Sequence, residues 1–381
     1  MNRERFPEQT VLIVDDDQNI GWGLASGLEE PGRDVIVCRD VESADLILKQ
    51  CPVTHVLTDI KFGGPFGFEG LQVIDHVRQR ISTAPVIAMT GHATDELRKE
   101  ALSRGAAALL QKPFPFDEID RLIPPTGSAE KGRVTFIPTI DEILSGNLLK
   151  PVFQPIVWTD NSQHAVGFEA LTRLTSDSPM ADPQSLFQYA VAKGRVVDLE
   201  LMTIKAAIHS GRKLSRTGFI SLNIHPDVFS VPDRLCDGLF NAAENAEVPL
   251  QRIVLEITEQ APLPELQAVE AVCTILHSHG VRLGFDDIGI AHSHLTAMAA
   301  VRPSYLKISQ HFGTSCENNP VNRKIIENVE SLARSFSCEV VLEGIETAAT
   351  AAFAQTMGIR FGQGYFYSPP VEAADLIKKY S

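Results

Sequence analysis

The chain of 381 residues lacks several features that would place it in common classes of protein. No apolar run approaches the ~20 residues of a membrane-spanning helix, and the opening stretch MNRERFPEQT lacks the apolar segment of a signal peptide. The cysteines form no CxxC pair, which favours reduced structural thiols over a zinc site. With 34 Lys and Arg against 48 Asp and Glu, the formal net charge of −14 disfavours a nucleic acid polymer as partner. We therefore expect a cytoplasmic protein with no membrane span.

Strands and helices alternate five times in the first third of the chain, which predicts a doubly wound, five-stranded parallel sheet. The chain is too long for one ordinary core, so a second domain is expected after it. A segment with prolines at both ends and small or charged residues between them predicts a linker at residues 125–138. The predicted strands of the first domain, residues 9–124, are 11–14, 35–38, 53–59, 85–90 and 106–111.

Polar side chains stand at the carboxyl ends of these predicted strands. Asp15 and Asp16 follow the first strand, Asp59 ends the third, and Thr90 and Lys112 end the last two. Ligands of doubly wound sheets collect at this edge. Three carboxylates brought together there would repel one another unless a divalent cation lay between them, which predicts a Mg²⁺ site. A carboxylate beside such an ion, with a lysine and a hydroxyl nearby, can accept a phosphoryl group.

Residues 9–124 resemble a response-regulator receiver domain, because VDDD, TDIK, MTGH and QKPF occur in that family's order. The resemblance implies that Asp59 is the phosphoacceptor and that a sensor histidine kinase is the partner. It also implies one Mg²⁺ or Mn²⁺ ion bound by Asp15, Asp16, Asp59 and the Lys61 carbonyl, with Thr90 and Lys112 contacting the phosphoryl group. Leu109 stands where the family usually has the aromatic residue that reports phosphorylation.

From residue 139 to 381, about eight predicted strands alternate with helices, which fits a (β/α)₈ barrel of the TIM type. An open doubly wound sheet is the alternative. An oxygen-rich or cationic side chain follows strand after strand, and such barrels build their active sites from the carboxyl ends of their strands. A single carboxylate at such a place is usually a helix cap, but the recurrence indicates a shared site. These residues are Glu169, Arg173, Asn223, Glu256, Asp286, Asp287, Lys307, Glu343 and Glu346.

This set of side chains predicts metal-dependent chemistry. Oxygen ligands without a thiolate or a histidine suit Mg²⁺ or Mn²⁺ rather than zinc. Several carboxylates at one barrel mouth could not all stay ionised without compensating charge, which two divalent ions would supply. Paired divalent ions can hold the attacking and leaving oxygens of a phosphodiester. Phosphodiester hydrolysis is therefore the predicted reaction.

Residues 139–381 also resemble an EAL domain, the phosphodiesterase family that linearises cyclic di-GMP. QPI, EALTR, SLNI, LEITE, DDIG, LKI, EGIET and GQGY occur in the family's order. The resemblance implies a barrel whose first strand is antiparallel, a homodimer and two Mg²⁺ or Mn²⁺ ions. The implied metal ligands are Glu169, Asn223, Glu256, Asp286, Asp287 and Glu343; the implied catalytic residues are Glu169, Lys307, Glu343 and Glu346. Gln154, Arg173 and Gln363 are implied to bind substrate, and Glu259 to anchor the loop after the paired aspartates.

Two hypotheses follow from this pattern. The first is a two-component response regulator whose EAL domain hydrolyses cyclic di-GMP to linear pGpG, under control of receiver phosphorylation. The alternative is a catalytically weak or inactive EAL domain that binds cyclic di-GMP or a protein as an effector. The alternative rests on departures from the family pattern at Ile288, Ile290, Ala291, His292 and His294, and on Ser309 in place of an aspartate. A DNA-binding regulator is disfavoured, because no basic helix is present.

Overall fold

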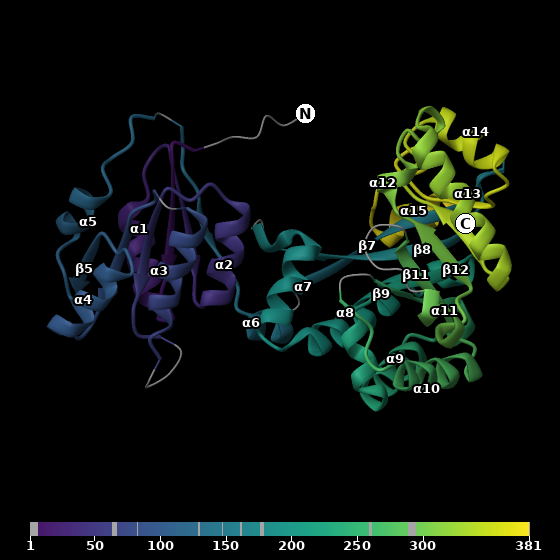
Figure 1. Cartoon of the computed structure of the whole chain (residues 1–381), viewed down its shortest axis with the longest axis horizontal. Helices are drawn as coiled ribbons and strands as arrows, with labels where there is room; N and C mark the ends of the chain where they lie inside the picture. The colour runs from purple at the N-terminus through teal and green to yellow at the C-terminus, as the bar shows by residue number, and fades with distance from the viewer. Residues whose placement is uncertain are drawn as a thin grey trace. The chain divides into compact units, whose positions relative to one another are not determined.

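A computed structural model of the chain describes residues 7–62, 67–81, 83–128, 130–146, 148–160, 162–175, 179–258, 261–288 and 295–380. The chain divides into two compact units (Figure 1). The first unit comprises Met1–Leu148 and Leu174–Gly194, and the second comprises Leu149–Arg173 and Arg195–Ser381. Among the described helices, none is both long and apolar enough to cross a lipid bilayer.

The first unit contains a parallel sheet with the strand order β5-β4-β3-β1-β2-β6. Side chains alternate between its faces, so Val11 and Ile13 pack with Leu24 of α1 and Ile119 of α5. The strands are β1 (Gln9–Val14), β2 (Arg33–Cys38), β3 (His55–Asp59), β4 (Val86–Thr90), β5 (Ala108–Gln111) and β6 (Val134–Phe136). The helices are α1 (Gln18–Leu28), α2 (Val41–Gln50), α3 (Glu69–Arg80), α4 (Asp95–Ser103) and α5 (Phe116–Leu122). The predicted doubly wound α/β fold is confirmed.

The sheet has six strands rather than the five expected from the sequence. The additional strand β6 lies within the segment predicted as a linker and pairs in parallel with β2, with Val35 opposite Val134. Three residues of half-buried character carry too little periodicity to be recognised as a strand. Their strand conformation comes from the free edge that β2 offers.

Two helices beyond β6 also belong to the first unit. The helix α6 (Ile140–Ser145) begins with a capping box in which Thr139 and Glu142 each accept the other's backbone N–H. The helix α7 (Pro183–Ala192) begins with the cap Asp182 and a proline at its first turn, both favourable at a helix start. The first unit therefore includes a segment that directly follows strand β8 of the second unit in the chain.

The second unit is a closed eight-stranded barrel with the order β10-β11-β12-β13-β14-β7-β8-β9. The first strand, β7, runs antiparallel to β14 as the resemblance implied, and the open-sheet alternative does not hold. The strands are β7 (Leu149–Trp158), β8 (Ala165–Leu174), β9 (Phe219–Ile224), β10 (Ile253–Ile257), β11 (Arg282–Ile288), β12 (Tyr305–Ile308), β13 (Glu339–Leu342) and β14 (Phe361–Gly362). The α-helices are α8 (Val196–Gly211), α9 (Pro232–Asn245), α10 (Leu266–Ser278), α11 (Leu295–Val301), α12 (Gln310–Gly313), α13 (Pro320–Phe336), α14 (Ala348–Thr356) and α15 (Ala373–Tyr380).

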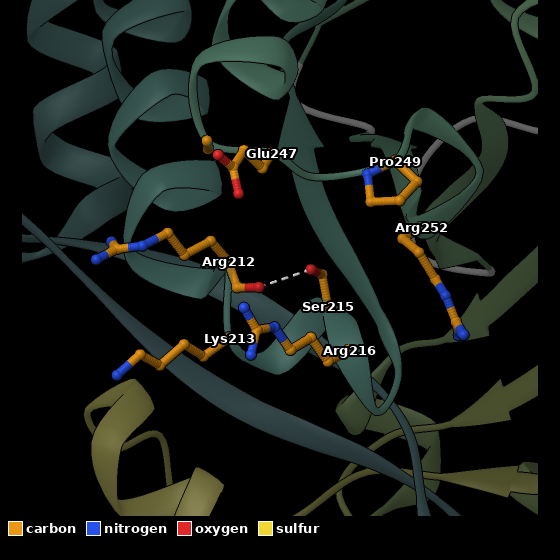
Figure 2. A pocket seen from close by; sticks show the side chains of 8 residues that line it. Arg212, Lys213, Ser215, Arg216, Glu247, Pro249 and Arg252 are labelled. Atoms are coloured by element: carbon orange, nitrogen blue, oxygen red, sulfur yellow. Dashed lines mark hydrogen bonds between the residues drawn. The ribbon is translucent and has the colours of Figure 1, made fainter.

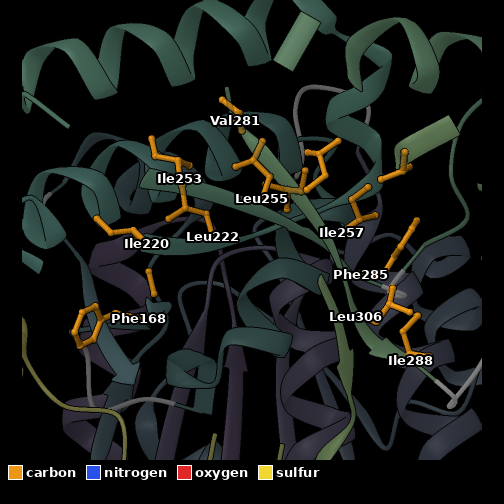
Figure 3. Packing of buried hydrophobic residues seen from close by; sticks show 14 of the residues in the cluster. Phe168, Ile220, Leu222, Ile253, Leu255, Ile257, Val281, Phe285, Ile288 and Leu306 are labelled. Carbon is orange, nitrogen blue, oxygen red and sulfur yellow. The ribbon is translucent and has the colours of Figure 1, made fainter. Parts of the chain in front are cut away.

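The two-residue repeat of the strands separates residues that pack against the surrounding helices from residues that point into the barrel. Leu222, Leu255, Phe285 and Leu306 belong to the large apolar cluster that includes residues of the surrounding helices (Figure 3). The residues that follow each of them therefore point into the barrel. At the amino ends of the strands the interior is filled by an apolar layer, which consists of Ile156, Phe219, Val254, Tyr305, Val341 and Phe361. The polar site is confined to the carboxyl ends.

A buried glutamate on α8 makes the stability of the barrel depend on pH. Glu200 is 1% exposed, and neither of its carboxylate oxygens has a hydrogen-bond partner among the described residues. Burial raises its pKa from 4.5 to about 8. The folded state thus holds a proton that the unfolded state releases near its lower pKa, so stability is lost as pH rises between these two values. We expect Glu200→Gln to remove this loss, which is on the order of 4 kcal/mol.

The measurement is denaturant unfolding followed by circular dichroism at several pH values from about 5 to about 9, on either side of the raised pKa. The variant should match the wild type at the acidic end and exceed its stability at the alkaline end. The exposed Glu244 on α9 provides the matched control, Glu244→Gln. Equal pH dependence of the wild type and Glu200→Gln would show that the buried carboxyl group does not titrate in this way.

Candidate active site

The predicted site residues of the barrel meet at the carboxyl ends of its strands. Asn223 of β9 lies directly opposite Glu256 of β10, which in turn lies opposite Gly284 of β11. A glycine at that register position leaves room above β11 for the neighbouring carboxylates. Glu169 of β8 is paired with Ser221, two residues before Asn223. The strand register therefore brings these side chains together without any contribution from loops.

Lys307 of β12 lies at the centre of the cluster and is fully buried. Its Nζ atom lies 2.7 Å from Glu343, 3.1 Å from both Glu169 and Asp286, and 3.2 Å from Glu256. A buried ammonium group requires charge partners of this kind, because an unpaired buried charge costs several kcal/mol. The four carboxylates hold the pKa of Lys307 well above its usual value against the opposing effect of burial. Lys307 therefore remains a cation.

Glu169 is fixed by amide groups from two other strands. Its Oε1 accepts a hydrogen bond from Asn223 Nδ2 at 2.6 Å, and its Oε2 accepts one from Gln363 Nε2 at 2.5 Å. Gln363 Nε2 also contacts Gln154 Oε1 at 2.9 Å, and Gln154 donates to the Ser368 carbonyl at 3.0 Å. Gln363 thus orients Glu169 and is itself held by Gln154, and both glutamines line the cavity above the site.

The two adjacent aspartates, Asp286 and Asp287, lie where strand β11 is irregular. The register of β11 against β12 shifts between Phe285 and Ile288, and Asp287 adopts a positive φ of 54°. Such a φ is uncommon for a residue with a side chain. The backbone N–H of Asp287 donates to Asp286 Oδ1 at 2.9 Å. This kink allows two adjacent residues to contribute to one site, whereas a regular strand would direct them to opposite faces.

Burial and mutual repulsion shift the ionisation of these carboxyl groups. Burial is the largest cause that raises the pKa of Glu256, Asp286 and Glu343, and Lys307 opposes it incompletely. For Glu169, burial also acts to raise the pKa, but Lys307 and the amides of Gln363 and Asn223 leave it below its ordinary value. One lysine therefore cannot keep the whole set of acids ionised, and further positive charge would be stabilising.

The donor atoms fit divalent metal ions. Ligand oxygens of Glu169, Glu256 and Asp286 lie within 4.8 Å of one another, as do those of Asp286, Asp287 and Glu343. Asp286 belongs to both groups and could bridge two ions. Asn223 Oδ1 is buried and has no hydrogen-bond partner among the described residues, as expected for an atom reserved for a ligand. All of these donors are oxygens, which Mg²⁺ and Mn²⁺ prefer.

A cavity of about 390 Å³ opens above the carboxylates. Arg173 lines it at the end of β8, with one guanidinium N–H donating to the Thr172 carbonyl at 2.8 Å. Glu346 also lines it but is exposed, so it belongs to the rim rather than to the buried cluster. The volume lies within the range of small-molecule sites, and Arg173 places a cation at one wall.

Two lining residues were missed by sequence reasoning. Tyr365 is 67% exposed at the cavity, and Gly364 before it is required because a Cβ there would lie 2.2 Å from the Ile345 carbonyl oxygen. Tyr365 is part of the GQGY motif, so the signal was present without an assigned role. Gln310, the first residue of α12, also lines the cavity, and no pattern in the sequence indicated it.

Three predictions about the loops can be compared with the structure only in part. Glu259, the predicted loop anchor, and four of the five altered loop positions (Ile290, Ala291, His292 and His294) lie outside the described residues. Ser309 is described, and its hydroxyl oxygen accepts the His311 backbone N–H at the start of α12. A serine therefore serves as a helix cap where the family motif has an aspartate, and aspartate can make the same cap.

A second carboxylate cluster lies in the first unit. Ligand oxygens of Asp15, Asp16 and Asp59 lie within 4.8 Å of one another. Lys112 Nζ contacts Asp15 Oδ2 at 2.6 Å and Asp59 Oδ2 at 3.0 Å. Burial is the main cause that raises the pKa of Asp15 and Asp16, with the Asp59 charge adding to it. The predicted constellation is thus assembled, and the exposed Asp16 leaves it open to solvent.

Thr90 and Lys61 complete the surroundings of Asp59. Thr90 ends β4, and its hydroxyl oxygen accepts the His92 backbone N–H at 3.3 Å. The Lys61 backbone N–H donates to Asp59 Oδ1 at 3.2 Å. Leu109 of β5 is buried, and its carbonyl accepts a hydrogen bond from Arg98 at 3.3 Å. The hydroxyl and the lysine predicted to contact a phosphoryl group therefore stand at the same sheet edge as the acids.

Together these features describe a protein of two parts: a doubly wound sheet with an acidic cluster at one edge, and a closed eight-stranded barrel with carboxylates gathered at the carboxyl ends of its strands. The EAL domain family matches residues 139–370, and the response regulator receiver domain family matches residues 11–123. The chain belongs to the EAL domain family and carries a receiver domain before it.

Relatives of known name support this assignment. Cyclic di-GMP phosphodiesterase PdeL of Escherichia coli is 27% identical over 62% of this chain and 66% of its own length. Cyclic di-GMP phosphodiesterase RocR of Pseudomonas aeruginosa is 23% identical over 95% of this chain and 96% of its own. The cAMP and cyclic-di-GMP bound form of the EAL enzyme Bd1971 is 26% identical, with a TM-score of 0.58 over 64% of this chain and 67% of that one. The chain spans only 22% to 66% of the first curated relatives.

Proposed function

We propose that the barrel hydrolyses cyclic di-GMP to the linear dinucleotide pGpG with two divalent metal ions. The observation that carries the proposal is the charge imbalance at the carboxyl ends of the strands, where four carboxylates share the ammonium group of Lys307. Glu169, Asn223, Glu256 and Asp286 would hold one ion; Asp286, Asp287 and Glu343 would hold the other. When bound, the ions would supply positive charge against the phosphate and lower the pKa of a water molecule.

The residues of the chain would position the reactants. Arg173 lies on the cavity wall, where its guanidinium can pair with a phosphate of the substrate. Because the pKa of Lys307 is raised well above its usual value, its ammonium group stays protonated and would donate a hydrogen bond to the attacking water. The water gives up one proton as its oxygen bonds to one phosphorus. The bond from that phosphorus to the ribose oxygen breaks, the ribose oxygen takes up a proton, and the ring opens. Glu346 at the rim and the amides of Gln154 and Gln363 would support this arrangement.

The test is incubation of the purified full-length protein with cyclic di-GMP and either Mg²⁺ or Mn²⁺, with the products separated by chromatography. We expect linear pGpG with either ion or both and no product in EDTA, because the acids need compensating charge. Calorimetric titration of cyclic di-GMP is the parallel measurement. Binding without any cleavage would select the effector hypothesis, and neither binding nor cleavage would contradict both.

We propose further that phosphorylation of Asp59 controls the barrel through α7. Strand β8 carries Glu169 and Arg173, and the chain continues from it into α7, which belongs to the first unit. Tyr189 of α7 is fully buried, donates to Asp40 Oδ2 at 2.6 Å and accepts the Ile140 backbone N–H at 3.2 Å. A change in the position of α7 would thus act on the strand that carries two site residues.

The receiver side of this connection begins beside the acidic pocket. The Asp15 backbone N–H donates to the Cys38 carbonyl at the end of β2. Two residues later, Asp40 caps α2 by accepting the Ser43 N–H at 2.9 Å. Lys193, at the end of α7, contacts Glu42 at 3.2 Å and Asp40 at 3.6 Å. Negative charge added at Asp59 would attract Lys193 and repel Asp40 and Glu42.

The substitution Tyr189→Phe should weaken the control of cyclic di-GMP hydrolysis by phosphorylation of Asp59. It removes the hydroxyl group that joins Asp40 to Ile140 and leaves the ring in place. We expect the ratio of hydrolysis rates between phosphorylated and unphosphorylated protein to move toward one, with the unphosphorylated rate retained. Tyr380→Phe in α15 is the matched control, since Tyr380 packs on Phe168. A wild-type ratio in Tyr189→Phe would exclude this route.

Two partners belong to the same proposal. A sensor histidine kinase would supply the phosphoryl group that Asp59 accepts, with Lys112 and Thr90 contacting it. A second copy of the chain would form a homodimer. Mass photometry of the purified protein with and without phosphorylation measures the second expectation directly.

A further inference from the structure

A second cavity lies at the opposite end of the barrel from the carboxylate site. It has a volume of about 420 Å³ and is lined by the segments that precede β9 and β10 (Figure 2). These segments contain the short turns Leu214–Arg216 and Leu250–Arg252, directly before the strands begin. Because a strand rises about 3.3 Å per residue, the part of β9 from Phe219 to Asn223 separates this hollow from Asn223 by roughly 13 Å. The hollow is therefore a separate place on the second unit.

Four cations surround this hollow. They are Arg212, Lys213, Arg216 and Arg252, and all four are exposed. Figure 2 shows Arg212 and Lys213 extending to one side, Arg252 on the other, and Arg216 between them, across from Glu247. Within the part of the chain that the structure describes, none of the four makes an ion pair. This concentration of unpaired positive charge stands out in a chain whose formal net charge is −14.

A purely structural role accounts for only part of this charge. Arg212 is the C-cap of α8, where the helix dipole favours a cation, and it donates to the His209 carbonyl at 2.8 Å. Arg216 and Arg252 end three-residue turns, whose dipoles are too small to require a cation. Cations gathered without carboxylate partners repel one another, which costs stability unless an anion lies among them.

We infer that this hollow binds the oligophosphate group of a nucleotide, at a site distinct from the cyclic di-GMP site. Guanidinium groups form paired hydrogen bonds to phosphate oxygens, and Arg216 and Arg252 offer two such groups from neighbouring turns. The volume lies within the range of small-molecule sites, roughly 300 to 1,000 Å³. Glu247, across the hollow from Arg216, offers an acceptor for the N–H or hydroxyl groups of a base or sugar. It would repel a phosphate, which fixes the orientation of the ligand.

The test is calorimetric titration of inorganic triphosphate into the full-length protein in EDTA. Without metal ions, the two carboxylate clusters repel anions, so binding under these conditions reports on the cationic hollow. We expect saturable one-to-one binding that weakens as salt is added, because the contacts are between exposed charges. The double variant Arg216→Ala with Arg252→Ala should bind at least about 10-fold more weakly, through the loss of two charge-assisted contacts.

Two control proteins isolate the effect. Lys324→Ala with Arg334→Ala removes two exposed cations of α13 that pair with Glu327 and Glu330, and should bind as the wild type does. Glu169→Ala, which alters the other end of the barrel, should also retain binding. Absence of saturable binding by the wild type, or unchanged binding by the Arg216 and Arg252 variant, would overturn the inference.

A second titration, with GTP, tests whether the hollow binds a nucleotide or only an inorganic phosphate chain. Tighter binding of GTP than of inorganic triphosphate, reduced to the triphosphate level by Glu247→Ala, would identify a nucleotide as the ligand. Equal affinities, unaffected by Glu247→Ala, would limit the site to phosphate recognition and overturn the nucleotide part of the inference. Both outcomes are independent of whether cyclic di-GMP is cleaved.

Discussion

Replacement of Glu169 by alanine is expected to abolish hydrolysis of cyclic di-GMP. Glu169 is 4% exposed and contacts Lys307, Asn223 and Gln363, so its removal takes away one proposed metal ligand and leaves these groups without their common partner. Changes to residues that merely support a metal ligand cost about 10- to 100-fold. Loss of a ligand itself should therefore exceed about 100-fold. The measurement is the initial rate of pGpG formation at fixed Mn²⁺.

The matched control removes a glutamate from the other end of the same barrel. Glu339 begins β13 and pairs with Arg360 at 2.5 Å on the surface. Such exposed pairs contribute about 1 kcal/mol or less, so Glu339→Ala should leave the barrel folded and its rate unchanged. Thermal unfolding of both variants shows whether a lost rate reflects lost structure. A Glu169→Ala protein that cleaves cyclic di-GMP at the wild-type rate would contradict the proposed catalytic role of the carboxylate cluster in the barrel.

The barrel site could be predicted because each member lies inside or directly after a strand. Apolar runs such as IVLEI and YLKI mark buried strands, and the polar residue within each run is an exception that demands a partner. The parallel register of the strands then brings these polar residues to one end of the barrel. By contrast, the kink that places Asp286 and Asp287 in one site depends on the positive φ of Asp287, for which the sequence offers no glycine as a signal.

Features that depend on tertiary partners could not be predicted in this way. The strand β6 exists because β2 has a free edge, and α7 is tied to the first unit by the hydrogen bonds of the buried Tyr189 with Asp40 and Ile140. Lys307 was expected among the catalytic residues; that it contacts four carboxylates at once follows only from the closure of the barrel.

Loss of the Asp59 carboxylate should remove phosphoryl labelling of the receiver completely. Asp59 ends β3 beside Asp15 and Asp16, and Lys112 Nζ lies 3.0 Å from its Oδ2. The lysine would pair with a phosphoryl group added there, and a divalent ion held by the three acids would offset its negative charge. We expect acetyl phosphate or a cognate kinase to label the wild type and not Asp59→Ala. Labelling is detected as a mass increase of the intact protein.

Asp17 provides the control. It follows Asp15 and Asp16 in the chain but serves as a helix cap. Its side chain accepts the Asn19 and Ile20 backbone N–H groups as the N-cap of α1. Asp17→Ala should therefore cost about 1 kcal/mol of stability and leave labelling intact. Equal labelling of the wild type and Asp59→Ala would place the acceptor elsewhere. If labelling is lost only in Asp59→Ala, the same variant also fixes the unphosphorylated reference rate against which coupling through Tyr189 is measured.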